Sequence, residues 1–338
     1  MTARHVIISG ASIAGLSTAH WLATLGYHVT VVEQAAAPRR GGAAINLQGE
    51  ALASTRRMGI YELVKAQGLP PLHFSFVATE PSAETPPPQA AELAADEAPT
   101  ANDAPEEVEI ERDKLVTLLL GAIQHKVDFL FSNRLTSLRE TADALHVTFT
   151  QAPARAFDLV IGCDGLHSGV RKLWFGHEAD YSCFLHHYAS LTIVNRLLLA
   201  ENTAQLYNVP GKAILINAYN GKTDIIFWFY SEAELDYDYR NTGQQQQIVA
   251  QQFAGHGWRT AELLAEVQQA GISYFDKFSQ IKMPSWTKGR VALVGDAAYC
   301  ASPAAGIGAS LAMQGAAAIA EALATHEGHV EVAFQAKL

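Results

Sequence analysis

The sequence predicts an α/β fold, in which a Rossmann-type domain is interleaved with a second domain built on a mostly antiparallel β-sheet. Three observations support this prediction. The chain opens with a strand, a glycine-containing loop, a helix and a second strand. Two later β-rich runs end in Asp-Gly and Gly-Asp. Between these two runs, short strand-like segments dominate the chain and include a hairpin signal.

The Rossmann-type domain is predicted to be discontinuous and to comprise residues 1–75, 106–180 and 282–338. Residues 181–281 are predicted to form the sheet domain, which would bind the substrate. The remaining stretch, residues 76–105, is rich in Pro, Ala and acidic side chains and contains no Lys or Arg. We expect it to be a mobile surface insertion, either a solvated loop or a lid over a substrate.

Composition excludes several classes of protein. The 338 residues suffice for about two domains with buried cores. A net charge of −10 gives no basic surface for nucleic-acid phosphates, so no nucleic-acid partner is expected. No apolar run is long enough to span a membrane, and the start of the chain lacks a secretory signal, so a cytoplasmic location is expected. The cysteines, Cys163, Cys183 and Cys300, are too widely spaced to predict a metal site.

The first strand, residues 5–9, leads into a glycine loop and an amphipathic helix that ends at Gly26. The loop matches the dinucleotide fingerprint G-x-G-x-x-G, with serine in place of the middle glycine. A pyrophosphate would lie at the helix N-terminus, where backbone N–H groups are available. A glycine turn before a helix is also often purely structural. The candidate binding residues in this loop are Gly10, Ser12, Ile13, Ala14 and Gly15.

Glu33 follows the second strand, about 20 residues beyond the loop, where an acid can bind a ribose hydroxyl. A carboxylate there suits an unphosphorylated ribose, so FAD or NAD is favoured over NADP at this site. The next segment has helical spacing of apolar residues from about residue 52. After the insertion, ordered structure is predicted to resume at residue 108, with the end of a strand that leads into a helix. Three strands are predicted to follow, at residues 127–132, 146–150 and 157–165.

The sheet domain is predicted from β-rich runs that surround Asn220-Gly221, a dipeptide typical of tight hairpins. Residues 243–271 predict one or two helices, and residues 272–282 predict a strand. The chain then returns to the first domain with a strand that ends at Gly295-Asp296. The final segment, residues 309–324, predicts a helix rich in small residues.

Three further motifs resemble those of the class A flavoprotein monooxygenases, the family of para-hydroxybenzoate hydroxylase and the tetracycline-inactivating monooxygenases. Arg112, in IERDKLVTLL, is similar to the arginine of the family's Arg-x-x-Leu motif, which reaches the flavin. Asp164-Gly165 resembles the DG motif, which is implicated in FAD and NAD(P)H binding, with Ser168 and Arg171 at its later positions. Gly295-Asp296 resembles the GD motif, whose aspartate binds the ribitol or ribose region of FAD.

The segment after the GD motif also resembles this family. There Pro303 would lie beside the isoalloxazine ring, and the backbone at Gly306 and Gly308 would meet its pyrimidine edge. Reduced flavin is anionic, so a helix N-terminus at this point would favour it. Arg40 matches the family's loop after the second strand, or is simply solvated. Arg112 has a similar alternative, a surface ion pair with neighbouring acids.

The resemblance implies an FAD-binding domain and a function. NAD(P)H would reduce FAD, and a flavin C4a-hydroperoxide would transfer one oxygen atom from O2 to an aromatic or polyketide-like small molecule. The polar aromatic residues of the sheet domain would contact that substrate. Candidates for deprotonating or hydrogen-bonding a phenol are His187, Tyr207 and Tyr230, which are alternatively ordinary core or surface residues. Alternate strand residues face opposite sides, so about half of such residues are expected to point away from the substrate.

Two departures from the family pattern leave an alternative open. Family members continue into further helical structure after the last predicted helix, so this chain is either truncated or naturally short. The acidic insertion stands where the family usually has strand structure of the substrate domain. A non-catalytic flavin- or ligand-binding protein on the same scaffold is therefore the alternative function. A flavin-dependent halogenase is disfavoured, because no Trp-x-Trp-x-Ile-Pro motif is present.

Overall fold

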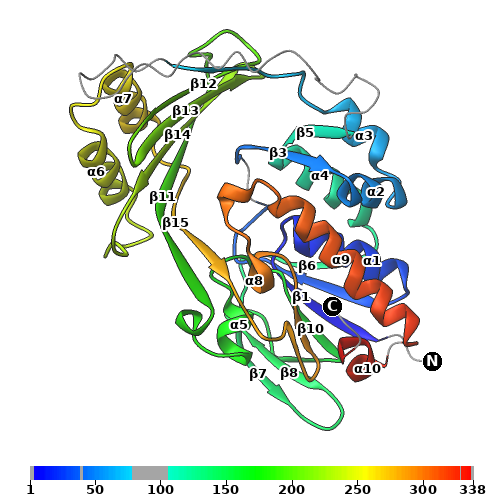
Figure 1. Cartoon of the computed structure of the whole chain (residues 1–338). Coiled ribbons are helices and arrows are strands. Elements are labelled where there is room, and N and C mark those ends of the chain that lie inside the picture. Colours follow the sequence, from blue (N-terminus) through cyan, green and yellow to red (C-terminus); the bar gives the residue numbers. More distant parts are fainter. Residues whose placement is uncertain (1–3, 39–40, 78–105, 328, 336–338) are drawn as a thin grey trace. The chain divides into compact units, whose positions relative to one another are not determined.

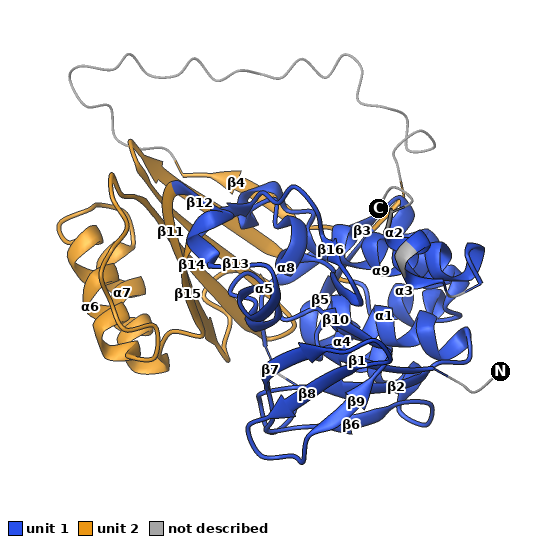
Figure 2. Ribbon diagram, turned by 90° about the horizontal axis from the view of Figure 1, so that it is seen from below, with its two compact units in different colours: residues 1–68, 108–185, 278–338 blue, residues 69–107, 186–277 orange. Residues whose placement is uncertain are grey.

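A computed structural model of the chain describes residues 4–38, 41–77, 106–327 and 329–335 (Figure 1). Two compact units are formed (Figure 2). Unit 1 comprises residues 1–68, 108–185 and 278–338, and unit 2 comprises residues 69–107 and 186–277. The predicted insertion, apart from residues 76 and 77, lies outside the described residues, as does Arg40.

Unit 1 is built on a six-stranded sheet whose strands are parallel except for β16 at one edge. This arrangement confirms the predicted α/β fold. The strands, in spatial order, are β16 (Thr287–Lys288), β17 (Val291–Leu293), β10 (Leu159–Gly162), β1 (His5–Ser9), β2 (His28–Val32) and β6 (Asp128–Leu130).

Both faces of this sheet are buried, which explains why its central strands read as continuous apolar runs. Val6 and Ile8 of β1 pack on one face with three helices, and Ile7 packs on the other with a small antiparallel sheet. The helices are α1 (Ile13–Thr24), α4 (Arg112–Ile123) and α9 (Gly308–Thr325). The small sheet consists of β7 (Leu135–Glu140), β8 (Leu145–Phe149) and β9 (Arg155–Phe157).

The segment predicted as one helix from about residue 52 is instead two helices with a strand before them. Gly59, at φ 73°, separates the helices, because an α-helix does not continue through a left-handed residue. The strand, β3 (Ala44–Gln48), pairs with β5 (Glu107–Glu111) in a two-stranded sheet. The shorter elements of unit 1 are β3 (Ala44–Gln48), α2 (Glu50–Arg57), α3 (Tyr61–Ala66), β5 (Glu107–Glu111), α5 (Gly169–Trp174), η1 (Glu178–Asp180), α8 (Asp296–Tyr299), η2 (Pro303–Ala305) and α10 (Val330–Gln335).

Unit 2 contains a second six-stranded sheet, in which the neighbours β11, β14, β13 and β12 are antiparallel. Asn220 and Gly221 both have positive φ at the turn between β13 and β14, as the hairpin signal predicts. The outer strand β4 runs parallel to β12, although the predicted range 1–75 assigns it to the first domain. The strands, in spatial order, are β15 (Tyr274–Ile281), β11 (Ser182–Val194), β14 (Lys222–Tyr230), β13 (Lys212–Tyr219), β12 (Thr203–Val209) and β4 (His73–Phe76).

Helices α6 (Thr242–Phe253) and α7 (Thr260–Ala270) cover one face of this second sheet (Figure 2). Phe253 of α6 makes ring contacts with Phe227 and Phe229, both fully buried on β14. Within the described part of the chain, no helix combines the length and the hydropathy needed to cross a membrane.

Candidate cofactor site

The two glycines that frame the fingerprint loop leave no room for a side chain. Gly10 has φ 105°, and its N–H donates to the Val32 carbonyl at 2.7 Å. A Cβ on Gly10 would lie 2.4 Å from the Cys163 carbonyl oxygen. A Cβ on Gly15 would lie 1.8 Å from the Gly10 carbonyl oxygen. The loop therefore packs directly on the end of β10, and only glycine is tolerated at either position.

The first turn of α1 is arranged to receive an anion. It contains the buried residues Ile13, Ala14 and Gly15 and no acidic side chain. Ser12 occupies the N-cap position, yet its side chain makes no capping hydrogen bond. The N-terminal N–H groups of a helix have no partner within the helix, and the helix dipole adds positive potential there. This end of α1 fits the pyrophosphate of a dinucleotide.

Glu33 lies just after β2 and braces the same loop. Its Oε2 accepts a hydrogen bond from the Ala11 N–H at 3.0 Å, and its Oε1 accepts one from the Ala35 N–H at 2.9 Å. A carboxylate oxygen can accept more than one hydrogen bond, so both oxygens retain capacity for a further donor. This arrangement fits the ribose contact predicted from the sequence.

Arg112, the first residue of α4, connects two segments that are far apart in the sequence. Its Nη2 donates to the Ser12 hydroxyl at 2.6 Å. A Cβ on Gly42 would lie 3.1 Å from the Arg112 Cδ, so that glycine lets the arginine pass close to the backbone. The neighbouring Asp113 accepts a hydrogen bond from the Gly41 N–H at 3.3 Å. The N-terminus of α4 thus organises both the fingerprint loop and the segment at residues 41–42.

Asp296 begins α8, directly after β17, and is exposed at its surface. Partial desolvation of the carboxylate by the surrounding protein raises the pKa of Asp296. A hydrogen bond with Cys300 and the charge of Arg112 act in the opposite direction and lower this pKa. Gly295 packs against α1, since a Cβ on Gly295 would lie 3.0 Å from the Cβ of Ala14. The fold therefore brings the GD segment, Arg112 and the fingerprint loop to one edge of the sheet.

The start of α9 provides a second uncapped helix N-terminus. The Ser302 side chain accepts a hydrogen bond from the Ala304 N–H, and Gly306 adopts the left-handed conformation that ends η2. Helix α9 then begins at Gly308, with no side-chain cap and no acid in its first turn. Pro303 and Gly306 are exposed, and a Cβ on Gly308 would lie 3.9 Å from Oδ1 of Asp296. This geometry fits the predicted flavin end of the cofactor.

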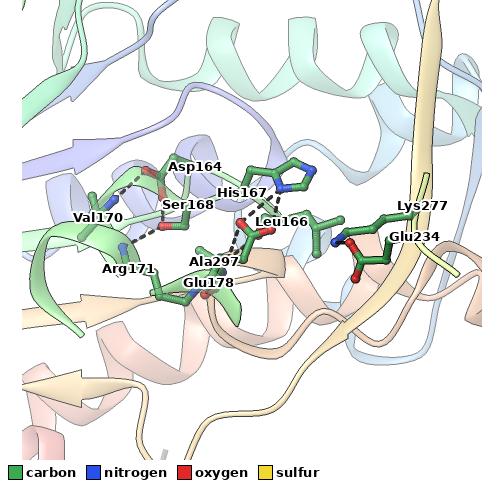
Figure 3. Close-up of polar contacts among 10 residues, drawn as sticks. All are labelled: Asp164, Leu166, His167, Ser168, Val170, Arg171, Glu178, Glu234, Lys277 and Ala297. Atoms are coloured by element: carbon green, nitrogen blue, oxygen red, sulfur yellow. Dashed lines mark hydrogen bonds and ion pairs between the residues drawn. The ribbon is translucent and has the colours of Figure 1, made fainter. Parts of the chain in front are cut away.

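The Asp164 carboxylate is turned toward its own loop (Figure 3). It accepts hydrogen bonds from the Ser168 hydroxyl at 2.5 Å and from the Val170 N–H at 3.0 Å. Burial raises the pKa of Asp164, and these hydrogen bonds lower it. The side chain therefore stabilises the start of α5, and a direct cofactor contact by Asp164 remains a prediction.

Arg171 is the best-buried charged side chain near this site, and its role could not be read from the motif alone. Its guanidinium donates to the Leu166 carbonyl at 2.5 Å, to the Ala297 carbonyl at 2.9 Å and to Glu178 at 3.2 Å (Figure 3). Burial lowers the pKa of Arg171, and the nearby Glu178 raises it. The arginine thereby joins the DG loop to the helix that follows the GD motif.

The three catalytic candidates all lie in unit 2, but not on one face of its sheet. His187 and Tyr230 are cross-strand neighbours on β11 and β14, with ring centroids 5.6 Å apart. Tyr207 of β12 is buried and stacks on Trp258, in the connection between α6 and α7. Among the described residues, no group of His, Cys, Asp or Glu side chains is arranged to hold a metal ion.

Comparisons with known proteins agree with the geometry of unit 1. The family model described as "FAD binding domain" matches residues 3–330. An uncharacterized protein of Mycobacterium tuberculosis is 40% identical over 315 residues, which cover 92% of this chain and 82% of that protein. A flavin-dependent monooxygenase of Legionella longbeachae is 32% identical over 332 residues, which cover 97% of this chain and 82% of the relative.

Among solved structures, tetracycline destructase Tet(55) is similar, with a TM-score of 0.83 and 31% sequence identity. The match covers 98% of this chain and 84% of that one. Two uncapped helix N-termini, the braced Glu33 and the closely packed glycines are the features that an FAD site needs, and they occur in the matched region. The chain belongs to the class A FAD-dependent aromatic monooxygenases, a family of enzymes that bind FAD.

Proposed function

We propose that this enzyme hydroxylates an aromatic or polyketide-like small molecule, with NAD(P)H as the electron donor and O2 as the source of the oxygen atom. One observation in unit 2 supports the proposal. Its sheet has one face closed by helices and one face that carries aromatic side chains with polar ends.

The alternation of burial along the strands separates the two faces. Ile214 and Ile216 of β13 and Phe227 and Phe229 of β14 are fully buried. The residues between them on the same strands are only partly buried, and Tyr230 is 49% exposed. Because successive strand residues point to opposite faces, the second set shares one open face.

The open face carries a cluster of three rings. His187 packs edge-on against both Trp228 and Tyr230, with centroids 5.7 and 5.6 Å apart. Asn217 of β13 lies on the same face, because it pairs with Asp224. Asp224 is four residues before Trp228 on β14, and strand residues an even number apart share a face. Aromatic rings supply apolar area for a flat substrate. The imidazole and hydroxyl groups can orient a phenol by hydrogen bonds, and the imidazole can accept its proton. Tyr207 faces the helices instead and is less suited to this role.

The residues of unit 1 have a complementary task. When bound, FAD would supply the redox chemistry, with NAD(P)H as the source of electrons and O2 as the source of the oxygen atom. The N-terminus of α9 would stabilise negative charge on the reduced ring, and Arg112 and Asp296 would hold the chain of the cofactor.

The test is turnover of the FAD-loaded full chain with a panel of probes. Tetracycline is the first probe, because a similar solved structure is a tetracycline destructase, and simple phenols are the next. The proposal predicts probe-dependent oxidation of NADPH or NADH, together with a product that carries an oxygen atom from ¹⁸O2. If FAD binds but no probe yields an oxygenated product, the non-catalytic binding function is supported instead.

A further inference from the structure

Ser12 departs from the fingerprint in sequence and from an ordinary N-cap in structure. Serine at an N-cap usually accepts a hydrogen bond from the backbone N–H of the first turn. Here the hydroxyl makes no such bond to α1 and instead accepts one from Arg112, 100 residues away. The replacement of glycine by serine therefore adds a tertiary contact and no helix cap.

The Arg112 side chain contacts both Ser12 and the backbone at Gly42. The Ser12 hydroxyl holds Nη2 of the guanidinium, and the backbone at Gly42 lies beside the aliphatic Cδ. A guanidinium has five N–H donors in a rigid plane, so the bond to Ser12 restricts the orientation of the whole group. The charge of Arg112 also acts on Asp296, so the two side chains are within electrostatic range.

We propose that Ser12 is a positioning residue, which holds the Arg112 guanidinium in the orientation that binds FAD. The inference rests on FAD binding at this loop, and it is independent of which substrate the enzyme hydroxylates. Ser12 acts through Arg112 and not through a bond of its own to the cofactor.

The physical reason is pre-organisation. Arginine loses considerable rotamer freedom when it is ordered, and a side chain that is already ordered loses less on binding a ligand. Removal of a hydrogen bond to a charged group has an effect of about tenfold on an equilibrium constant. We therefore expect Ser12→Ala to raise the Kd for FAD about tenfold, and we expect Ser12→Thr, which keeps a hydroxyl, to restore most of the affinity.

The experiment is a titration of the FAD-stripped full chain with FAD, followed by quenching of flavin fluorescence. The matched control is Ser17→Ala on the same helix, where the hydroxyl is buried and has no hydrogen-bond partner among the described residues. The control should leave the Kd for FAD unchanged. Circular dichroism melting shows that each variant is folded at the temperature of the titration. Loss of the Ser12 hydroxyl removes the bond to Arg112 but no helix cap, so only a small fall in the melting temperature is expected.

A double-mutant cycle with Arg112→Met tests whether Ser12 changes the Kd for FAD through Arg112 or through a direct contact with FAD. If Ser12 acts through Arg112, Ser12→Ala has no further effect on the Kd in the Arg112→Met background. An undiminished effect in that background would show a direct contact and overturn the inference. Ser12→Gly, which restores the standard fingerprint, provides a second test: weaker binding supports the inference, and equal or tighter binding contradicts it.

Discussion

A Cβ on Gly15 would lie 1.8 Å from the carbonyl oxygen of Gly10, so the two glycines of the loop are in direct backbone contact. This relationship sets the distance between the start of α1 and the end of β1. Gly10 itself packs against Cys163, which follows β10 at the start of the DG segment, since a Cβ on Gly10 would lie 2.4 Å from the Cys163 carbonyl oxygen.

Gly15→Ala is expected to destabilise the protein by at least about 2 kcal/mol, because the backbone must shift to admit the methyl group. FAD binding should be lost with it, since the loop moves. Gly121→Ala is the matched control, as this exposed helical glycine has open space around it. That substitution should be neutral or stabilise by up to about 1 kcal/mol. Urea denaturation of both variants measures the difference, and equal stabilities would refute the close packing.

Arg171→Met is expected to lower the free energy of unfolding by about 2 to 3 kcal/mol. The variant leaves the Leu166 and Ala297 carbonyls and Glu178 without the buried donor that now binds them. Lys172→Met changes the adjacent, exposed residue and should shift stability by no more than about 0.5 kcal/mol. If both variants unfold at the same urea concentration, the link between the DG loop and α8 contributes nothing to stability.

The affinity for FAD is expected to fall on acidification, because an ionised Asp296 is the better acceptor for a cofactor hydroxyl. Partial desolvation of the carboxylate by the surrounding protein raises the pKa of Asp296, so protonation in the FAD-free protein begins at a higher pH than for an ordinary aspartate. FAD binding favours the ionised form and must therefore weaken as pH falls through that pKa. Titrations across the acidic range check this, with Asp296→Asn as the comparison. A pH dependence that survives in Asp296→Asn would have to come from another group.

Trp228→Ala is expected to reduce turnover of an identified substrate at least tenfold, chiefly through KM, because it removes ring area from the open face. The Kd for FAD should not change, since FAD binding is assigned to unit 1. Tyr239→Phe alters a tyrosine that is 68% exposed and lies outside the sheet, and it should have no effect on kcat or KM. Equal kinetic constants for wild type and Trp228→Ala would exclude this face as the substrate surface.

The sequence was most informative where backbone geometry dictates residue type. Apolar β-branched runs predicted β1, β2 and β10, since strands buried on both faces have no polar alternation. Short elements in mixed sequence were missed, among them β3, whose pairing with β5 depends on a segment far along the chain. The break between α2 and α3 was also missed, although Gly59 was a visible signal.

Side-chain partners across long sequence separations could not be predicted. The bond between Ser12 and Arg112 requires α1 and α4 to pack side by side, which no local pattern encodes. Similarly, His187 and Tyr207 are equally plausible as polar aromatic residues in strands. Only the pairing of β11 with β14, of β14 with β13 and of β13 with β12 shows that these two side chains face opposite sides of the sheet.

Anaerobic reduction tests the central claim most directly. The FAD-loaded full chain would be mixed with NADPH or NADH, with and without tetracycline or a simple phenol, and its visible spectrum recorded before and after O2 is admitted. We predict that a nicotinamide nucleotide bleaches the bound flavin and that O2 restores its absorbance. A folded chain whose bound flavin is bleached by neither nucleotide, with any probe, would contradict the proposed monooxygenase reaction.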